Sequence, residues 1–121
     1  MCGIVGYIGE RDIESILLVG LERLSYRGYD SSGIATIFEG ELSYWKKDGK
    51  IHELEDMLKT LTIKGNIGIG HTRWATHGRP DTKNAHPHIS NNLIAVVHNG
   101  IIENYEILRD QLKNAGYQFS S

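Results

Sequence analysis

The spacing of apolar and polar residues predicts a chain of mixed strands and helices. Short apolar runs, several of them interrupted by glycine, are typical of strands that other backbone segments approach closely. The expected strands are residues 3–8, 33–38, 42–46, 66–72 and 93–98. Glu39-Gly40 predicts a hairpin turn between the second and third of these, and Asn99-Gly100 predicts a turn after the last.

Helical periodicity marks three further segments. Residues 11–24 carry apolar side chains at helical spacing, and residues 51–61 place three leucines on one face. A third helix is expected over residues 103–115, with Gly116 as its C-terminal cap. The stretches 27–33 and 73–90 are expected to be loops.

Composition narrows the class of protein without identifying its chemistry. The 121 residues fit one domain, and a net charge of -2 gives no indication of a nucleic-acid partner. No apolar run is long enough to span a membrane, and the N-terminus has no basic region leading into an apolar stretch. A single cysteine excludes an intrachain disulfide framework, so a reducing, cytoplasmic location is expected.

The position of that cysteine is the first indication of function. Cys2 follows the initiator methionine, and removal of Met1 would leave Cys2 with a free α-amine. An α-amine has a pKa near 7.7–8.0, so part of it is unprotonated at neutral pH and can act as a general base. Nucleophile and base would then belong to one residue, which suits attack on an amide. The alternative is a small, buried, structural cysteine.

Other residues could complete an amide-cleaving site. Asn99 could donate from its side-chain amide and Gly100 from its backbone N–H to the oxyanion formed on attack, although Asn-Gly alone is also an ordinary turn. Arg73 is suited to a bidentate pair with the α-carboxylate of an amino acid, although a surface salt bridge is an alternative. Trp74, a large aromatic residue on a polar loop, is expected to pack against something.

The histidine-rich segment raises a zinc site as an alternative. Five histidines occur at positions 71, 77, 86, 88 and 98. None of their pairs has the usual helical metal spacing, and Cys2 is the one thiol, so no metal is expected. His86-Pro87-His88 is expected instead to hold its loop together by hydrogen bonds.

Five blocks of the sequence together resemble one family. They are Cys2 to Gly6, Tyr26 to Gly33, His71 to Gly78, Asn84 to His88 and Val97 to Asn104. In this order they resemble the glutaminase domain of the glucosamine–fructose-6-phosphate aminotransferases, which are class II amidotransferases. Asparagine synthetases and amidophosphoribosyltransferases share the N-terminal Cys-Gly-Ile and the Asn-Gly turn but differ at the second and third blocks.

The resemblance implies an α+β fold of the N-terminal nucleophile hydrolase type, with stacked antiparallel sheets between helical layers (α/β/β/α), incomplete here. It implies that Cys2 forms a γ-glutamyl thioester and that Asn99 and Gly100 form the oxyanion hole. Arg73 would bind the glutamine carboxylate, and the loop over it would be shaped by Trp74, Thr76 and His77. Arg27 and Gly28 would lie near the nucleophile.

The resemblance also implies parts beyond these residues. Residues 1–121 correspond to the front of a glutaminase domain, and the chain ends just inside an expected strand at Tyr117–Phe119, so we expect it to be a truncated piece. The remainder of that domain and the sugar isomerase domains would follow, with fructose 6-phosphate bound there. The whole enzyme would be a homo-oligomer without a cofactor. A non-catalytic module that binds glutamine or a partner is the competing hypothesis.

Overall fold

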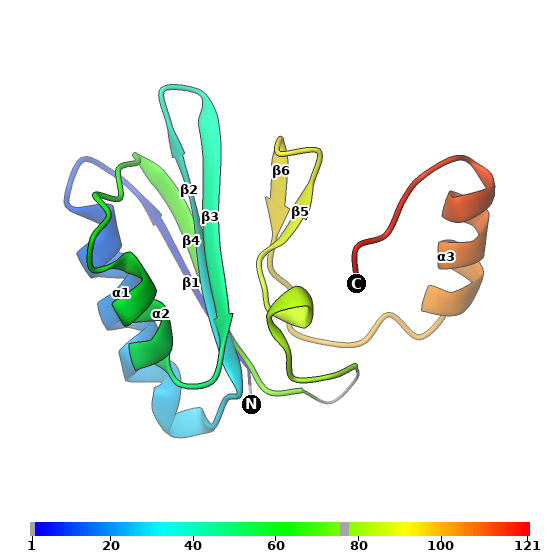
Figure 1. Ribbon diagram of the computed structural model, residues 1–121, viewed down its shortest axis with the longest axis horizontal. Coiled ribbons are helices and arrows are strands. Elements are labelled where there is room, and N and C mark those ends of the chain that lie inside the picture. The colour runs from blue at the N-terminus through cyan, green and yellow to red at the C-terminus, as the bar shows by residue number, and fades with distance from the viewer. Residues whose placement is uncertain (1, 76–77) are drawn as a thin grey trace.

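The computed structural model describes residues 2–75 and 78–121, so Met1, Thr76 and His77 lie outside the described residues. Eleven elements follow one another along the described chain (Figure 1). The strands are β1 (Gly3–Ile8), β2 (Ser31–Phe38), β3 (Glu41–Asp48), β4 (Ile67–Arg73), β5 (His88–Ser90) and β6 (Ile94–Val96). The helices are α1 (Ile13–Leu24), α2 (Ile51–Leu58) and α3 (Tyr105–Asn114), with 3-10 turns η1 (Ser25–Arg27) and η2 (Thr82–Asn84).

Four of the strands form one antiparallel sheet, in the order β1-β4-β2-β3. β4 lies between β1 and β2 and pairs Gly3 with Thr72 on one edge and Ser31 with Arg73 on the other. The start of the chain therefore lies beside the end of β4. β5 and β6 form a separate antiparallel pair.

The hydrophobic core lies between this sheet and the helices α1 and α2, which cover one face (Figure 1). Its buried members from the helices are Ile13, Leu17, Leu21, Ile51, Leu54 and Leu58, and Ile34 joins them from β2. Because side chains alternate across a strand, the helix-facing positions of β4 are Gly68, Gly70 and Thr72. The two glycines admit Ile13, Leu17 and Leu21 against the backbone, where a Cβ atom would be 2.7 to 3.3 Å from their methyl groups.

The same alternation places a different set of residues on the opposite face of the sheet. His71 and Arg73 of β4 lie there. Gly33 of β2 is the register partner of His71, and Lys46 of β3 is the register partner of Gly33. The segment that carries η2, β5 and β6 covers this face (Figure 1). One face of the sheet is thus packed under helices. The other face carries polar residues at its His71 end, under the loop, and exposed apolar residues such as Ile8 and Ile67 at its far end.

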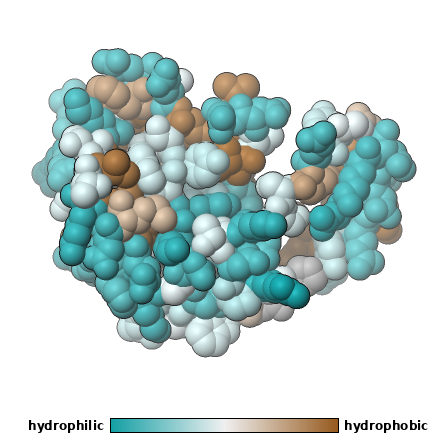
Figure 2. Space-filling view, in the orientation of Figure 1, coloured by the Kyte–Doolittle hydropathy of each residue, from teal (hydrophilic) through white to brown (hydrophobic). Residues whose placement is uncertain are grey.

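Helix α3 stands apart from the sheet, and none of its residues is buried. Gly116 (φ +97) ends it, with Tyr117 N donating to Leu112 O, as the predicted glycine cap requires. The apolar side chains Ile107, Leu108 and Leu112 are exposed on it. Figure 2 shows the hollow that separates this part of the molecule from the sheet.

Most predicted elements are present, with changed ends. β2 begins at Ser31, inside the predicted loop, because Ser31 and Ser32 already pair with Arg73 and Thr72. α2 ends at Leu58, and Leu61, predicted on its apolar face, is 45% exposed. The predicted strand at Tyr117–Phe119 is wrong: these residues have no regular structure, since no strand in the described chain lies beside them. No helix of the described residues is long and apolar enough to cross a membrane.

Candidate active site

The Cys2 side chain lies against the end of β4. The backbone N–H of Trp74 donates to Cys2 Sγ over 3.3 Å, and Sγ lies 3.8 Å from Trp74 O. Gly3 N donates to the buried hydroxyl of Thr72 over 3.1 Å, which fixes the backbone next to Cys2. The thiol is half-buried, so it is held in place and still reached from solvent.

Asn99 reaches the same point from the connection between β6 and α3. Its amide Nδ2 donates to Cys2 O over 3.2 Å, and its Oδ1 lies 2.7 Å from His71 Nε2. Gly100 follows with φ +148, a conformation that favours glycine, and a Cβ atom there would lie 3.2 Å from the His98 ring. Asn99, predicted to stabilise an oxyanion, thus contacts the backbone of the predicted nucleophile, and Gly100 follows it in the chain.

Arg73 is 7% exposed, and its Nη1 donates to Arg79 O over 2.8 Å. The carbonyl of Arg73 accepts from Asp30 N over 2.7 Å, and Asp30 Oδ2 accepts from Ala75 N over 2.5 Å. Asp30 therefore fixes the backbone on both sides of Trp74. The guanidinium, predicted to bind a carboxylate, also holds the loop at Arg79 in this structure.

Gly28 and Trp74, both predicted site residues, lie in contact. Gly28 has φ +82, and a Cβ atom on it would lie 3.4 Å from the indole ring of Trp74. Trp74 is 49% exposed, so the indole packs on Gly28 with one side open to solvent. Arg27 is half-buried in η1, directly before Gly28. Thr76 and His77, predicted to shape the loop over glutamine, lie outside the described residues.

Three histidine rings gather behind Asn99. The rings of His71 and His86 stack with centroids 4.2 Å apart, and the His88 ring meets that of His86 edge-on at 4.4 Å. Burial, followed by the positive charges of neighbouring groups, lowers the pKa of His86 to about 3. Burial also lowers the pKa of His71 and of His88. Among the described residues no group of three or more histidine, cysteine, aspartate or glutamate side chains is placed to hold a metal ion.

Comparison with curated proteins gives matches over the whole chain. The whole chain is 58% identical to the glutamine–fructose-6-phosphate aminotransferase (isomerizing) of Shewanella oneidensis and 59% identical to that of Synechocystis. The protein of the same name from Clostridium acetobutylicum is 57% identical over 122 aligned positions. The chain spans about a fifth of the length of these relatives (20%, 19% and 20%). No family model matches the chain.

Solved structures agree with these matches. The chain superposes over its full length on an allosteric regulatory enzyme of purine biosynthesis, with a TM-score of 0.84 and 31% identity, and covers 27% of that chain. It superposes on glutamine phosphoribosylpyrophosphate amidotransferase from B. subtilis with a TM-score of 0.79 and the same identity, again covering 27% of that chain. The chain matches the N-terminal region of the aminotransferases named above, and its structural neighbours include an amidotransferase. The predicted fold class, α+β with antiparallel sheets, is confirmed.

Two further residues hold the site although the sequence gives no sign of this role. Asp30 lies within the Tyr26 to Gly33 block, and it fixes the loop around Trp74. Lys46 was regarded as the end of a strand, yet its Nζ donates to three carbonyl oxygens: Lys83, Ala85 and Pro87, at 3.3, 2.9 and 3.3 Å. Burial lowers the pKa of this amine. Both contacts join residues distant in sequence, and no local pattern signals them.

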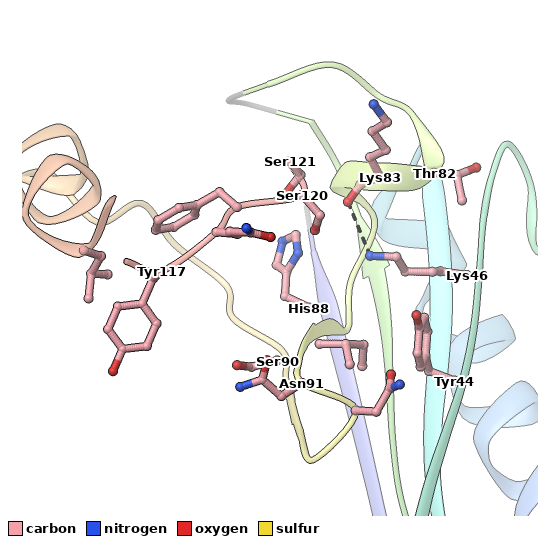
Figure 3. Close-up of a pocket in the computed structure, with 15 residues that line it drawn as sticks. Tyr44, Lys46, Thr82, Lys83, His88, Ser90, Asn91, Tyr117, Ser120 and Ser121 are labelled. Atoms are coloured by element: carbon pink, nitrogen blue, oxygen red, sulfur yellow. Dashed lines mark hydrogen bonds between the residues drawn. The ribbon is translucent and has the colours of Figure 1, made fainter. Parts of the chain in front are cut away.

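A hollow among the described residues lies away from Cys2. It has a volume of about 820 Å³, is open to solvent, and lies between β3, β5 and the C-terminal segment (Figure 3). Its lining includes Lys46, His88 and Phe119 but none of the described residues predicted to act on glutamine. The candidate site is instead the half-buried corner where Cys2, Trp74 and Asn99 meet.

Proposed function

We propose that this chain is the first part of the glutaminase domain of a longer enzyme, which makes glucosamine 6-phosphate from fructose 6-phosphate and glutamine. The name shared by relatives that are 57 to 59% identical over the whole chain supports this activity. The single observation that carries the glutaminase assignment is the convergence on Cys2 of the Trp74 N–H and the Asn99 amide. The remainder of the glutaminase domain and the sugar-binding domains would follow residue 121.

In the proposed reaction the Cys2 thiolate attacks the side-chain carboxamide of glutamine. A carbon–sulfur bond forms, the carbonyl π-electrons move to oxygen, and a tetrahedral oxyanion results. Asn99 Nδ2 and Gly100 N would donate to that oxygen. Collapse of the intermediate breaks the carbon–nitrogen bond, and the nitrogen takes a proton and leaves as ammonia. Water then cleaves the γ-glutamyl thioester to glutamate and regenerates the thiol.

The proton of the thiol needs a base, and the α-amine of Cys2 would supply one once Met1 is removed. While Met1 is attached, this nitrogen is an amide and has no usable basicity. The α-amine would accept the thiol proton on attack and return it to the leaving nitrogen. Removal of Met1 is therefore part of the proposed mechanism.

Substrate recognition would depend on the loop after β4. The Arg73 guanidinium would bind the glutamine α-carboxylate, a planar bidentate match. Trp74, Thr76 and His77 would shape the cover over the substrate, with Arg27 and Gly28 beneath the indole. The Gly28–Trp74 contact supports this part of the proposal. We propose a cytoplasmic homo-oligomer that needs no cofactor.

Replacing Cys2 tests the proposal. In the full-length protein, Cys2→Ala should abolish glutamine hydrolysis, while formation of glucosamine 6-phosphate from free ammonia continues. An electrophilic glutamine analogue should label the wild-type protein at Cys2 and leave the variant unlabelled. Hydrolysis at the wild-type rate in Cys2→Ala would refute the nucleophile. A protein that binds glutamine without hydrolysing it would favour the non-catalytic module.

A further inference from the structure

The orientation of the Asn99 amide follows from its two partners. One end of the amide lies 3.2 Å from Cys2 O, a carbonyl oxygen that can only accept. The atom facing it must therefore be Nδ2, and the atom facing His71 must be Oδ1. Since Oδ1 can only accept, the His71 Nε2 that lies 2.7 Å from it must carry a proton.

The other nitrogen of His71 agrees with this assignment. His71 is completely buried, and its Nδ1 has no hydrogen-bond partner among the described residues. A proton on Nδ1 would be buried without an acceptor, so a neutral ring is better accommodated with its proton on Nε2. Burial lowers the pKa of the ring and outweighs its contacts with the Asn99 side chain and the His98 backbone, which raise that pKa.

His86 binds the residue before Asn99 by accepting a hydrogen bond, whereas His71 donates one. The backbone N–H of His98 donates to His86 Nδ1 over 3.3 Å, so Nδ1 of His86 must be unprotonated. The rings of His86 and His71 stack at 4.2 Å with 25° between their planes. One histidine thus binds the backbone of residue 98, and the other binds the side chain of residue 99.

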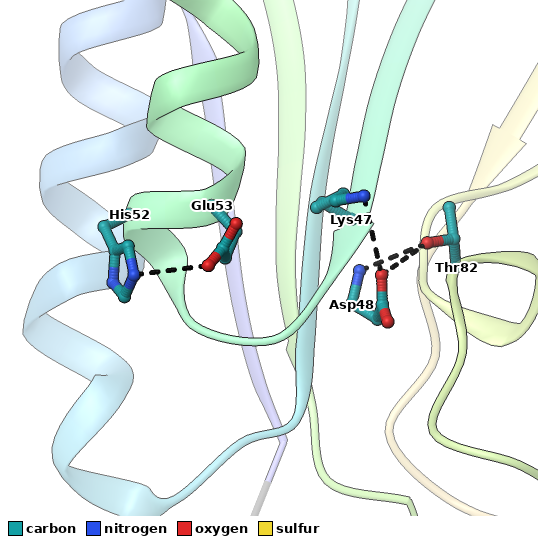
Figure 4. Close-up of polar contacts among 5 residues, drawn as sticks. All are labelled: Lys47, Asp48, His52, Glu53 and Thr82. Carbon is teal, nitrogen blue, oxygen red and sulfur yellow. Dashed lines mark hydrogen bonds and ion pairs between the residues drawn. The ribbon is translucent and has the colours of Figure 1, made fainter.

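The face of the sheet opposite the helices fixes this stacked pair. Gly33 lies beside His71 in register, and a Cβ atom on it would lie 2.1 Å from His86 O, so only glycine admits the His86 backbone there. Lys46 donates to the carbonyls on both sides of His86, those of Ala85 and Pro87 (its contact with Lys83 O is drawn in Figure 3). Thr82 Oγ1 donates to Asp48 Oδ1 over 2.9 Å and ties the start of the same loop to β3 (Figure 4).

We propose that His71 and His86 are positioning residues for glutamine hydrolysis: together they hold the His98–Asn99 segment so that the Asn99 amide nitrogen faces Cys2. His71 does so by donating from Nε2, and His86 by accepting at Nδ1. Neither ring touches the substrate or exchanges a proton in the reaction. This inference rests on the proposed function, because it assigns Asn99 the task of stabilising the oxyanion.

Paired substitutions in the full-length protein test the inference. His71→Phe keeps a ring but has no N–H, and it should lower kcat for glutamine hydrolysis by about tenfold to a hundredfold with KM nearly unchanged. His71→Gln retains a donor near the Nε2 position and should recover most of the loss. His86→Asn retains an acceptor near the Nδ1 position and should resemble wild type, whereas His86→Leu should lose activity as His71→Phe does.

A double-mutant cycle distinguishes positioning from general damage. If His71 acts through Asn99, His71→Phe should lower kcat much less in an Asn99→Ala background than in wild type. Equal factors in both backgrounds would overturn the proposal, as would wild-type kcat in a folded His71→Phe protein. A thermal melt provides the control that the glutaminase part of each variant is folded, and synthesis from free ammonia, which does not use Cys2, shows that the sugar-binding domains are intact.

The tautomer itself can be observed without any substitution. In protein labelled with 15N-histidine, NMR should find His71 neutral with its proton on Nε2, and His86 unprotonated at Nδ1. A proton on Nδ1 of either ring would overturn the proposal even if every variant misfolded. Failure of the proposed function is a separate result: Cys2→Ala would then hydrolyse glutamine normally, whatever the histidine tautomers.

Discussion

The backbone N–H of Trp74 donates to the sulfur of Cys2 over 3.3 Å, although 72 positions separate the two residues in sequence. The contact depends on the pairing of β1 with β4, which aligns Gly3 with Thr72 and so brings the residues beyond them together. The sheet register therefore places a backbone donor at the predicted nucleophile.

Retention of Met1 should abolish glutamine hydrolysis. With Met1 attached, the nitrogen of Cys2 is an amide and cannot take the thiol proton, so trimming should be an activating step. Full-length protein with and without Met1, identified by intact mass, should be assayed for glutamate release and for synthesis from free ammonia. The second activity should be the same in both forms. Equal glutaminase rates in the two forms would show that the α-amine is not the base.

Substitution of Arg73 should affect substrate binding more than turnover. Arg73→Ala should raise KM for glutamine by a factor equivalent to about 1.5–3 kcal/mol, because a carboxylate contact is present in ground state and transition state alike. Arg73→Lys keeps the charge without the fork and should lie between Ala and wild type.

The Arg73 bond to Arg79 O makes a thermal melt an essential companion measurement. A lower melting temperature with unchanged KM would assign Arg73 to loop anchoring alone. An increase in KM without loss of stability would favour the carboxylate contact.

Gly33→Ala should disrupt the stacked histidines. The added methyl group would lie 2.1 Å from His86 O, a backbone atom that cannot rotate away, and overpacking of this kind costs about 1–3 kcal/mol. Urea unfolding should show that loss, and kcat for glutamine should fall with it. Gly6→Ala is the matched control in β1, since a Cβ atom there meets nothing within 4 Å. Similar losses at both positions would contradict the close approach of His86 to β2.

Stability should fall as the pH is lowered from about 6.5 towards 3. The pKa of His86 is about 3 in the folded chain against an ordinary value of 6.5, so the unfolded chain binds more protons between these pH values. Each such proton makes the unfolding free energy fall by at most about 1.4 kcal/mol more for every pH unit. His71 and His88, whose pKa values are also lowered, act in the same direction.

Titration of Glu55 changes stability with pH in the opposite direction, so the measurement should use a variant that lacks this carboxyl group. A hydrogen bond with Glu22, together with burial, raises the pKa of Glu55 to about 7, so its contribution to stability is present below pH 4.5 and is lost as the pH rises to 7. In a Glu55→Gln background, His86→Asn should make the pH dependence of the unfolding free energy shallower. An unchanged slope would mean that His86 is protonated in the folded chain.

Sequence periodicity predicted the local elements because local spacing determines them. The Glu39-Gly40 turn, with φ +51 and +79, and the Gly116 cap lie where their residue types require. The burial of Ile13, Leu17 and Leu21 follows the helical spacing of α1. The predicted strand at Tyr117–Phe119 failed because a strand needs a partner, and the apolar pattern of a segment does not supply one.

The contacts of the candidate site join residues that are distant in sequence, so local spacing does not predict them. Its residue types were available from sequence and resemblance, but the His71 contact with Asn99 and the Lys46 contacts with the loop depend on three-dimensional arrangement. Asp30 gave no local signal, because its partners, Arg73 and Ala75, lie more than 40 positions away. The sequence therefore predicted which residue types carry the chemistry better than it predicted the contacts that position them.

The separation of the two sheet faces has a consequence for insertions in β4. Odd-numbered positions such as His71 and Arg73 carry the polar contacts, whereas Gly68, Gly70 and Thr72 face the helices. One extra residue ahead of His71 would send the imidazole and the guanidinium towards the helix face, where Leu21 and Leu24 lie, and bring a glycine to face Asn99. Two extra residues would restore the original facing. Damage from lengthening this strand should thus follow the parity of the insertion more than its size.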